Sequence, residues 1–163
     1  MYARPFIDSL DFAGNSRQID THVPVAALSR LQDMLDNCDG DLHYVVQGGL
    51  DNLARPILDI SVEGVCWLLC QRCLHGFEYG INHQARLLLC DQASLDSQDE
   101  EEDFDGILAE AHLDVLTLLE DEILLSLPIS PMHPLGLCQM AEGESANKGD
   151  RHPFSVLEKL KRN

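Results

Sequence analysis

Basic residues are scarce in this chain of 163 residues. It has 11 Lys and Arg against 28 Asp and Glu, which gives a formal net charge of -17 at pH 7. A surface of this sign repels polyanions and anionic lipid. The composition therefore excludes binding to DNA or RNA through broad contact with the phosphates.

Long apolar runs are also missing. No stretch of about 18 apolar residues occurs, so no segment is expected to span a membrane. The first residues, MYARPFIDSLDFAG, lack a basic flank followed by a long apolar run. We therefore expect a cytoplasmic protein whose six cysteines are thiols or metal ligands rather than a disulfide framework.

The charge is unevenly distributed along the chain. Between Leu87 and Asn147 there is no Lys or Arg. The acidic stretch near 93–106 predicts a flexible, solvated loop. Its residues Glu100, Glu101, Glu102 and Asp103 either keep the protein soluble or form a strip that binds a basic partner. The tail reverses the sign, with Lys159, Lys161 and Arg162 near the end.

The hydrophobic pattern predicts one α+β domain over residues 1–163. Alternating or apolar segments indicate an antiparallel meander. Strands are expected at 17–22, 42–50 and 77–90, and a longer one in RPILDISVEGVCWLLC at 55–70, starting just after Arg55-Pro56. Two to three helices accompany this sheet. They are expected at 24–37, from the N-cap Asp114 to Pro128, and in a short segment near the end. Residues 135–152 predict irregular structure.

Two cysteines spaced as C-x2-C, Cys70 and Cys73, lie in the predicted turn between two strands. A tight turn brings two such sulfurs to one side, but zinc requires four ligands. The best second pair is His133 with Cys138, which follows the predicted helix. One alternative is a set of buried thiols without a metal. A redox pair is a weaker alternative, because it needs its first cysteine at the N-terminus of a helix, and here a strand precedes Cys70. Cys38, Cys66 and Cys90 are expected to be structural.

No catalytic constellation occurs in the sequence. A glycine-rich phosphate loop and a G-x-S-x-G motif are both missing. The consecutive carboxylates at 120–122 point around their helix and do not form a facing pair. His83 is expected to be a satisfied core histidine and Trp67 a core residue. We therefore predict a protein that is not an enzyme.

Three segments together resemble the YceD family, the large ribosomal RNA subunit accumulation proteins. They are CQRC at 70–73, EDEILLSLP at 120–128, and HPFSVLEKLKRN at the end of the chain. The resemblance implies a role in the synthesis, processing or stability of 23S rRNA. Many members carry a fuller cysteine cluster after the helix, whereas PMHPLGLCQM here keeps one His and one Cys.

The charge and the resemblance together predict a factor in ribosome biogenesis that acts through a basic protein, either ribosomal or RNA-processing. Direct contact with RNA would be limited to a small basic tip formed by Lys159, Lys161, Arg162 and Arg72. Arg72 alternatively is an exposed turn residue or pairs with a carboxylate. The competing functions are a zinc-containing RNA-processing enzyme and a general interaction module with an indirect effect on rRNA.

Overall fold

The computed structural model describes residues 3–96, 105–134 and 136–138. Its main feature is a six-stranded sheet in the order β2-β4-β5-β6-β7, with β3 paired to β5 beside this path. The strands are β2 (Gln18–Pro24), β3 (Leu35–Asn37), β4 (Asp41–Leu50), β5 (Pro56–Leu69), β6 (Gly76–Cys90) and β7 (Asp105–Leu108). Helices and this mostly antiparallel sheet form an α+β fold, as predicted.

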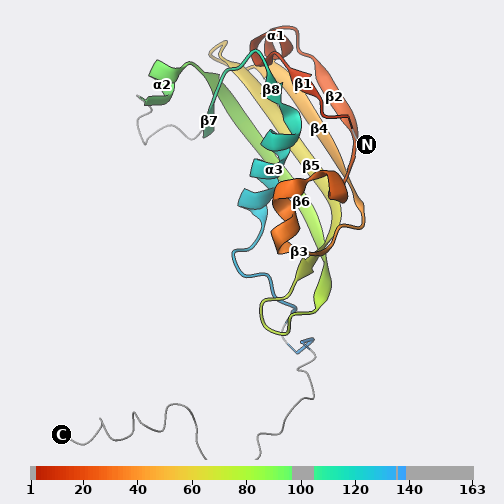
Figure 1. Cartoon of the computed structure of the whole chain (residues 1–163). Coiled ribbons are helices and arrows are strands. Elements are labelled where there is room, and N and C mark those ends of the chain that lie inside the picture. Colours follow the sequence, from red (N-terminus) through yellow and green to blue (C-terminus); the bar gives the residue numbers. More distant parts are fainter. Residues whose placement is uncertain (1–2, 97–104, 135, 139–163) are drawn as a thin grey trace, which may run out of the picture.

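The longest strands form a hairpin whose register positions the functional site. β5 and β6 pair along almost their whole length, from Ile57 opposite Leu88 to Leu69 opposite Gly76. Leu58, Ile60 and Val62 of β5 are buried, because alternate side chains of a strand share one face. The loop that joins the two strands, residues 70–75, therefore projects beyond the sheet (Figure 1).

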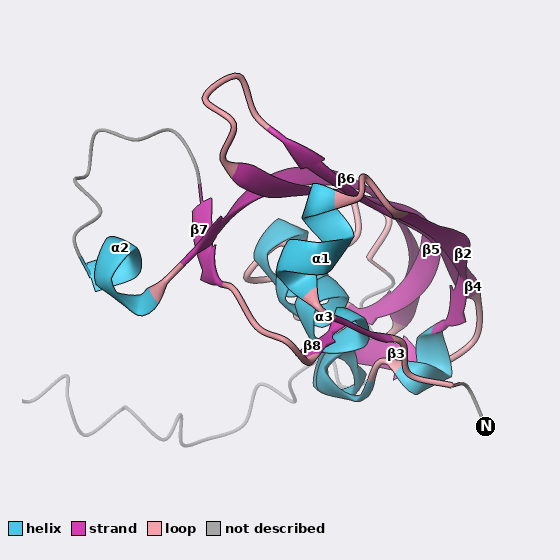
Figure 2. Ribbon diagram, turned by 90° about the horizontal axis from the view of Figure 1, so that it is seen from above, coloured by secondary structure: helices cyan, strands magenta, loops and turns pink. Residues whose placement is uncertain are grey.

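Two of the helices, α1 (Ser9–Gly14) and α3 (Val115–Ser126), lie in the concave side of the curved sheet (Figure 2). Both bury apolar side chains in the same core as the sheet. Beside them, β1 (Phe6–Ile7) pairs with β8 (Leu113–Asp114). The short helix α2 (Gln92–Asp96) follows β6. No helix in the described ranges is long and apolar enough to cross a membrane.

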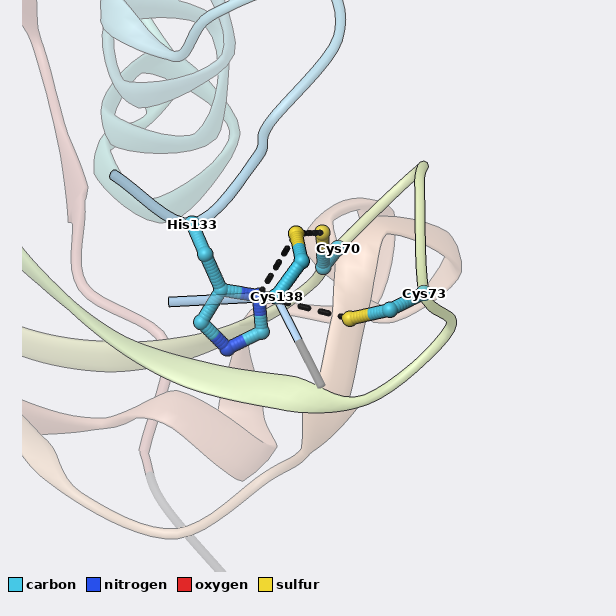
Figure 3. Close-up of side chains that lie close together, drawn as sticks. All are labelled: Cys70, Cys73, His133 and Cys138. Atoms are coloured by element: carbon cyan, nitrogen blue, oxygen red, sulfur yellow. Dashed lines mark hydrogen bonds between the residues drawn. The ribbon is translucent and has the colours of Figure 1, made fainter. Parts of the chain in front are cut away.

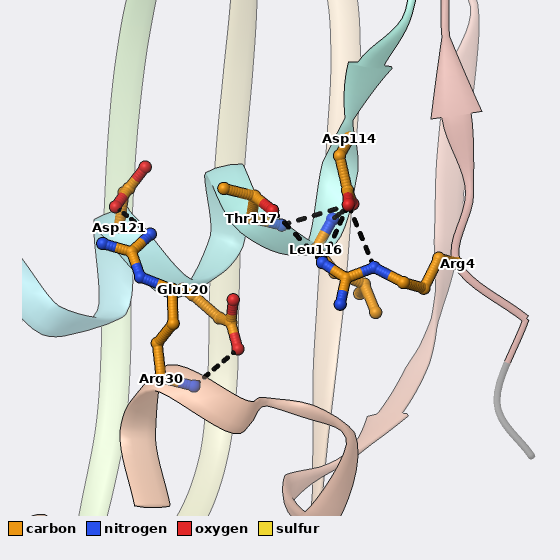
Figure 4. Close-up of polar contacts among 7 residues, drawn as sticks. All are labelled: Arg4, Arg30, Asp114, Leu116, Thr117, Glu120 and Asp121. Carbon is orange, nitrogen blue, oxygen red and sulfur yellow. Dashed lines mark hydrogen bonds and ion pairs between the residues drawn. The ribbon is translucent and has the colours of Figure 1, made fainter. Parts of the chain in front are cut away.

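Polar contacts hold α3 at its N-terminus and near its middle (Figure 4). The predicted N-cap is confirmed, because the Asp114 carboxylate accepts hydrogen bonds from the backbone N–H groups of Leu116 and Thr117. Arg4 forms an ion pair with Asp114 at 2.8 Å. The buried Glu120 accepts the backbone N–H of Arg30 at 3.0 Å, which satisfies a carboxylate that is costly to bury alone.

His83 and Glu122 join the same helix to the sheet. The Nε2 atom of His83, on β6, lies 3.0 Å from a carboxylate oxygen of Glu122. The Glu122 side chain is largely buried and that of His83 is partly buried. His83 therefore has a hydrogen-bond partner, as predicted, but it is only partly buried and does not belong to the core. Glu122 is paired locally with it.

Three local predictions need correction. Residues 24–37 do not form an α-helix but two 3-10 segments, η1 (Val25–Ala27) and η2 (Ser29–Met34), followed by β3. The apolar residues Val25, Leu28 and Leu31 recur every third position, which also fits the three residues per turn of a 3-10 helix. Trp67 is 37% exposed, because it lies on the outer face of β5.

The third correction concerns the end of the meander. β7 pairs in parallel with residues 87–90 of β6, so the sheet is not antiparallel throughout. Within the expected loop near 93–106, α2 and β7 occupy the two ends, and residues 97–104 lie outside the described ranges. The same holds for the terminal helix and for most of the irregular segment near 135–152.

Gly48 of β4 provides a test of how closely α1 packs on the sheet. A Cβ atom at this position would lie 2.5 Å from the backbone oxygen of Phe12, whereas at the neighbouring Gly49 the nearest atom is 3.9 Å away. We predict that Gly48→Ala lowers the free energy of unfolding by about 1–3 kcal/mol through overpacking. Gly49→Ala, the matched control, should change it little. Equal effects in urea denaturation would contradict the packing described here.

Candidate metal centre

The hairpin loop has the conformation of a tight turn around Cys70. The backbone N–H of Cys70 donates to the oxygen of His75 at 3.0 Å, and the N–H of Leu74 donates to the oxygen of Cys70 at 2.9 Å. Leu74 adopts a positive φ of 58°. Glycine is the usual residue in this left-handed conformation. Here Leu74, directly after Cys73, adopts it, and the turn still forms. The turn brings both cysteine sulfurs to one side.

The second half of the site is delivered by α3. The helix ends at Ser126, and Pro128 prevents its continuation. The chain then runs from Leu127 to the hairpin loop (Figure 1). There the backbone N–H of Gln71 donates to the oxygen of Pro131 at 2.9 Å. This bond fixes the segment beside the loop, close to His133 and Cys138.

Four side chains converge where the two segments meet (Figure 3). The sulfurs of Cys70 and Cys138 lie 3.7 Å apart. The Nδ1 atom of His133 lies 3.4 Å from the sulfur of Cys73 and 3.8 Å from that of Cys138. One ligand atom from each of the four residues lies within 4.8 Å of the others. This Cys3His group can bind a metal ion.

Hydrogen bonding prepares Cys70 to act as a thiolate. Burial of its sulfur raises the pKa, but N–H groups of the backbone at Cys73, His133 and Arg72 and the His133 side chain lower it, to about 5. For Cys138, burial and the neighbouring Cys70 and Cys73 raise the pKa. The thiolate, not the thiol, is the form that binds metals.

The other cysteines of the chain are not part of this group. Cys66 is buried in the core, and burial raises the pKa of its thiol to about 11. Cys90 is also buried, whereas Cys38 is exposed. These positions agree with the expected structural role for Cys66 and Cys90, which pack as small apolar residues.

Arg72 lies at the tip of the loop, between two of the cysteines. Within the described residues, every other arginine has an ion pair with an aspartate; the pairs are Arg4–Asp114, Arg17–Asp11, Arg30–Asp121, Arg55–Asp51 and Arg86–Asp59. Arg72 instead contacts the sulfur of Met132 at 3.6 Å. Its guanidinium group is thus the one in the described part of the chain that no carboxylate neutralises.

The remaining predicted partner-binding residues lie outside the described ranges; they are Glu100, Glu101, Glu102, Asp103, Lys159, Lys161 and Arg162. A groove with a volume of about 550 Å³ lies beside the Cys3His group and was not predicted from the sequence. Its walls include Phe77 and Tyr79 of β6 and, opposite them, Met132 and Pro134. Phe77 also contacts the ring of His133, with the ring centres 4.9 Å apart. The sequence carries no periodic signal for a groove between a strand edge and an irregular segment.

Comparison with known proteins agrees with the resemblance found in the sequence. A family model described as "Large ribosomal RNA subunit accumulation protein YceD" matches residues 58–161. The match includes nearly all of the β5–β6 hairpin, α3 and all four members of the Cys3His group. No solved structure matches the chain. The family name implies a role in the accumulation of large-subunit ribosomal RNA, and the chain belongs to the YceD family.

Proposed function

We propose that this protein is a cytoplasmic, non-enzymatic factor in ribosome biogenesis that supports the synthesis, processing or stability of 23S rRNA through a basic protein partner. The partner is a ribosomal protein or an RNA-processing protein. The family description supports the process. The observation that carries the mechanism is the near-complete neutralisation of positive charge on the described residues.

The charge distribution favours contact with a protein over contact with RNA. The net charge is -17, and the described arginines other than Arg72 already pair with aspartates. Binding along RNA requires several free Lys or Arg to neutralise phosphates. An acidic surface instead attracts a basic protein and increases its rate of association. Contact with RNA would then be confined to Arg72 and the basic end of the chain.

We further propose that the Cys3His group binds zinc. In a tetrahedral zinc centre with Zn–S bonds of about 2.3 Å and Zn–N bonds of about 2.05 Å, two sulfurs lie about 3.8 Å apart and a sulfur and a nitrogen about 3.6 Å apart. The corresponding distances here are 3.7 Å for Cys70 to Cys138, and 3.4 Å and 3.8 Å from His133 to Cys73 and Cys138. Three of the six distances between ligand atoms therefore match a zinc tetrahedron, and all four atoms lie within 4.8 Å of one another.

The number of ligands argues for a structural role of the metal. Structural zinc sites have four protein ligands, whereas catalytic sites have three and leave a position for water or substrate. Cys70, Cys73, His133 and Cys138 would fill the tetrahedron. The ion would join the hairpin loop to the segment that follows α3. This favours an interaction protein over the alternative of a zinc-containing RNA-processing enzyme.

The metal proposal predicts the effect of removing one ligand. The purified chain should contain close to one zinc ion per molecule, measured by inductively coupled plasma mass spectrometry. Cys70→Ser should lose most of it and unfold at a lower temperature, because metal binding contributes to folding. Cys38→Ser is the matched control, since Cys38 is exposed and outside the group, and it should keep the ion. A wild-type chain without zinc would refute the metal centre.

The partner proposal predicts the effect of neutralising the acidic strip. Replacement of Glu100, Glu101, Glu102 and Asp103 by their amides should weaken binding to a basic partner by about 15-fold, if each exposed ion pair contributes about 0.4 kcal/mol. The salt dependence of binding should flatten as well. Binding to large-subunit ribosomal proteins can be measured at several salt concentrations. If deletion of residues 157–163 lowers binding while the amide variant does not, the basic end rather than the acidic strip makes the contact.

A further inference from the structure

Two of the sulfurs in the Cys3His group form a close pair across separate parts of the chain. Cys70 lies in the hairpin loop and Cys138 in the segment after α3, and their sulfurs are 3.7 Å apart. The sulfur of Cys73 instead lies 3.4 Å from Nδ1 of His133. A disulfide has a sulfur–sulfur distance of about 2.05 Å. A shift of less than about 2 Å would therefore join Cys70 to Cys138.

The two sulfurs differ in their access to solvent. Cys70 is completely buried, with an exposed fraction of 0%, whereas Cys138 is partly exposed. A small oxidant in solution can therefore reach Cys138 first. The buried Cys70 is then positioned as the second thiolate that attacks the oxidised sulfur, an arrangement typical of a resolving cysteine.

We infer that Cys70 and Cys138 form a redox modification site, in which hydrogen peroxide converts the pair into a disulfide and the metal ion is released. The Cys138 thiolate attacks one peroxide oxygen, which forms a sulfenic acid and releases hydroxide. The Cys70 thiolate then attacks the Cys138 sulfur, which forms the disulfide and releases a second hydroxide. The two thiolates lose two electrons, and peroxide accepts both.

When the disulfide replaces the metal ion, the hairpin loop and the segment after α3 stay connected. Before oxidation, the ion joins Cys70 and Cys73 to His133 and Cys138; afterwards a covalent bond joins Cys70 to Cys138. The hydrogen bond from Gln71 to Pro131 does not involve these sulfurs and remains available in both forms. Oxidation would therefore change the metal content and the charge next to Arg72, while the hairpin stays attached to the segment after α3. This inference rests on the zinc centre proposed above.

The test uses the full-length chain as purified under reducing conditions. Its zinc content is measured first, which tests the proposed centre separately. Hydrogen peroxide is then added, zinc release is followed with a metallochromic dye, and disulfides are mapped by mass spectrometry after alkylation. We expect close to one equivalent of zinc to be released, with the Cys70–Cys138 linkage as the main product. Dithiothreitol and added zinc should reverse both changes.

Variants make the result specific. Cys38→Ser should release zinc and form the same linkage as the wild type, because Cys38 lies outside the group. Cys73→Ser should still form the Cys70–Cys138 linkage in its metal-free form. A main product that joins Cys70 to Cys73, or sulfinic acids without a disulfide, would overturn the inference. If the purified chain holds no zinc but forms Cys70–Cys138, the zinc centre fails and the disulfide site stands.

Discussion

The packing of α3 against the concave face of the sheet is the constraint on which the site depends. Val115, Leu119 and Ile123 are completely buried in the common core. The Asp114 cap and the contact of Glu120 with Arg30 set where the helix begins and how it is rotated. With the helix held in this way, Pro128 ends it where the chain can continue to the hairpin loop. Residues some 60 positions apart thus meet in one cluster.

Two separate parts of the fold therefore supply the halves of the cluster, and neither half is sufficient alone. The β5–β6 register places the loop with Cys70 and Cys73 beyond the sheet. The segment after α3 brings His133 and Cys138. Because the two halves are already hydrogen bonded through Gln71 and Pro131, a bound ion would stabilise an arrangement that the fold prepares. A disulfide between Cys70 and Cys138 would form between the same two segments, which this hydrogen bond already holds together.

Much of this could be predicted from local patterns. Alternation of apolar residues predicted β4, β5 and β6, and Asp114 with Pro128 predicted both ends of α3. The C-x2-C spacing together with His133 and Cys138 predicted the four residues that meet. The missed features depend on contacts between distant segments. The parallel pairing of β7 leaves no periodic signal, and the three-residue spacing at 25–31 fits an α-helix and a 3-10 helix alike. The outward direction of Trp67 follows from the strand register rather than from its hydrophobicity.

The electrostatics connect the fold to the proposed function. Ion pairs neutralise the arginines on the body of the protein, so that Arg72 at the loop tip is the one described guanidinium group left without a carboxylate. In the proposed function, the protein would act on large-subunit RNA without broad contact, because a basic protein partner would supply the positive charge that RNA binding requires. Under this proposal, the acidic surface would bind the basic protein and Arg72 at the tip would contact RNA.

The most direct test of this account is a crosslinking pull-down of the protein from cells, performed with and without ribonuclease. We predict that basic ribosomal or RNA-processing proteins are recovered in similar amounts in both cases, because they contact the protein itself. Recovery that disappears after ribonuclease treatment, together with direct crosslinks to 23S rRNA over an extended region, would contradict the account.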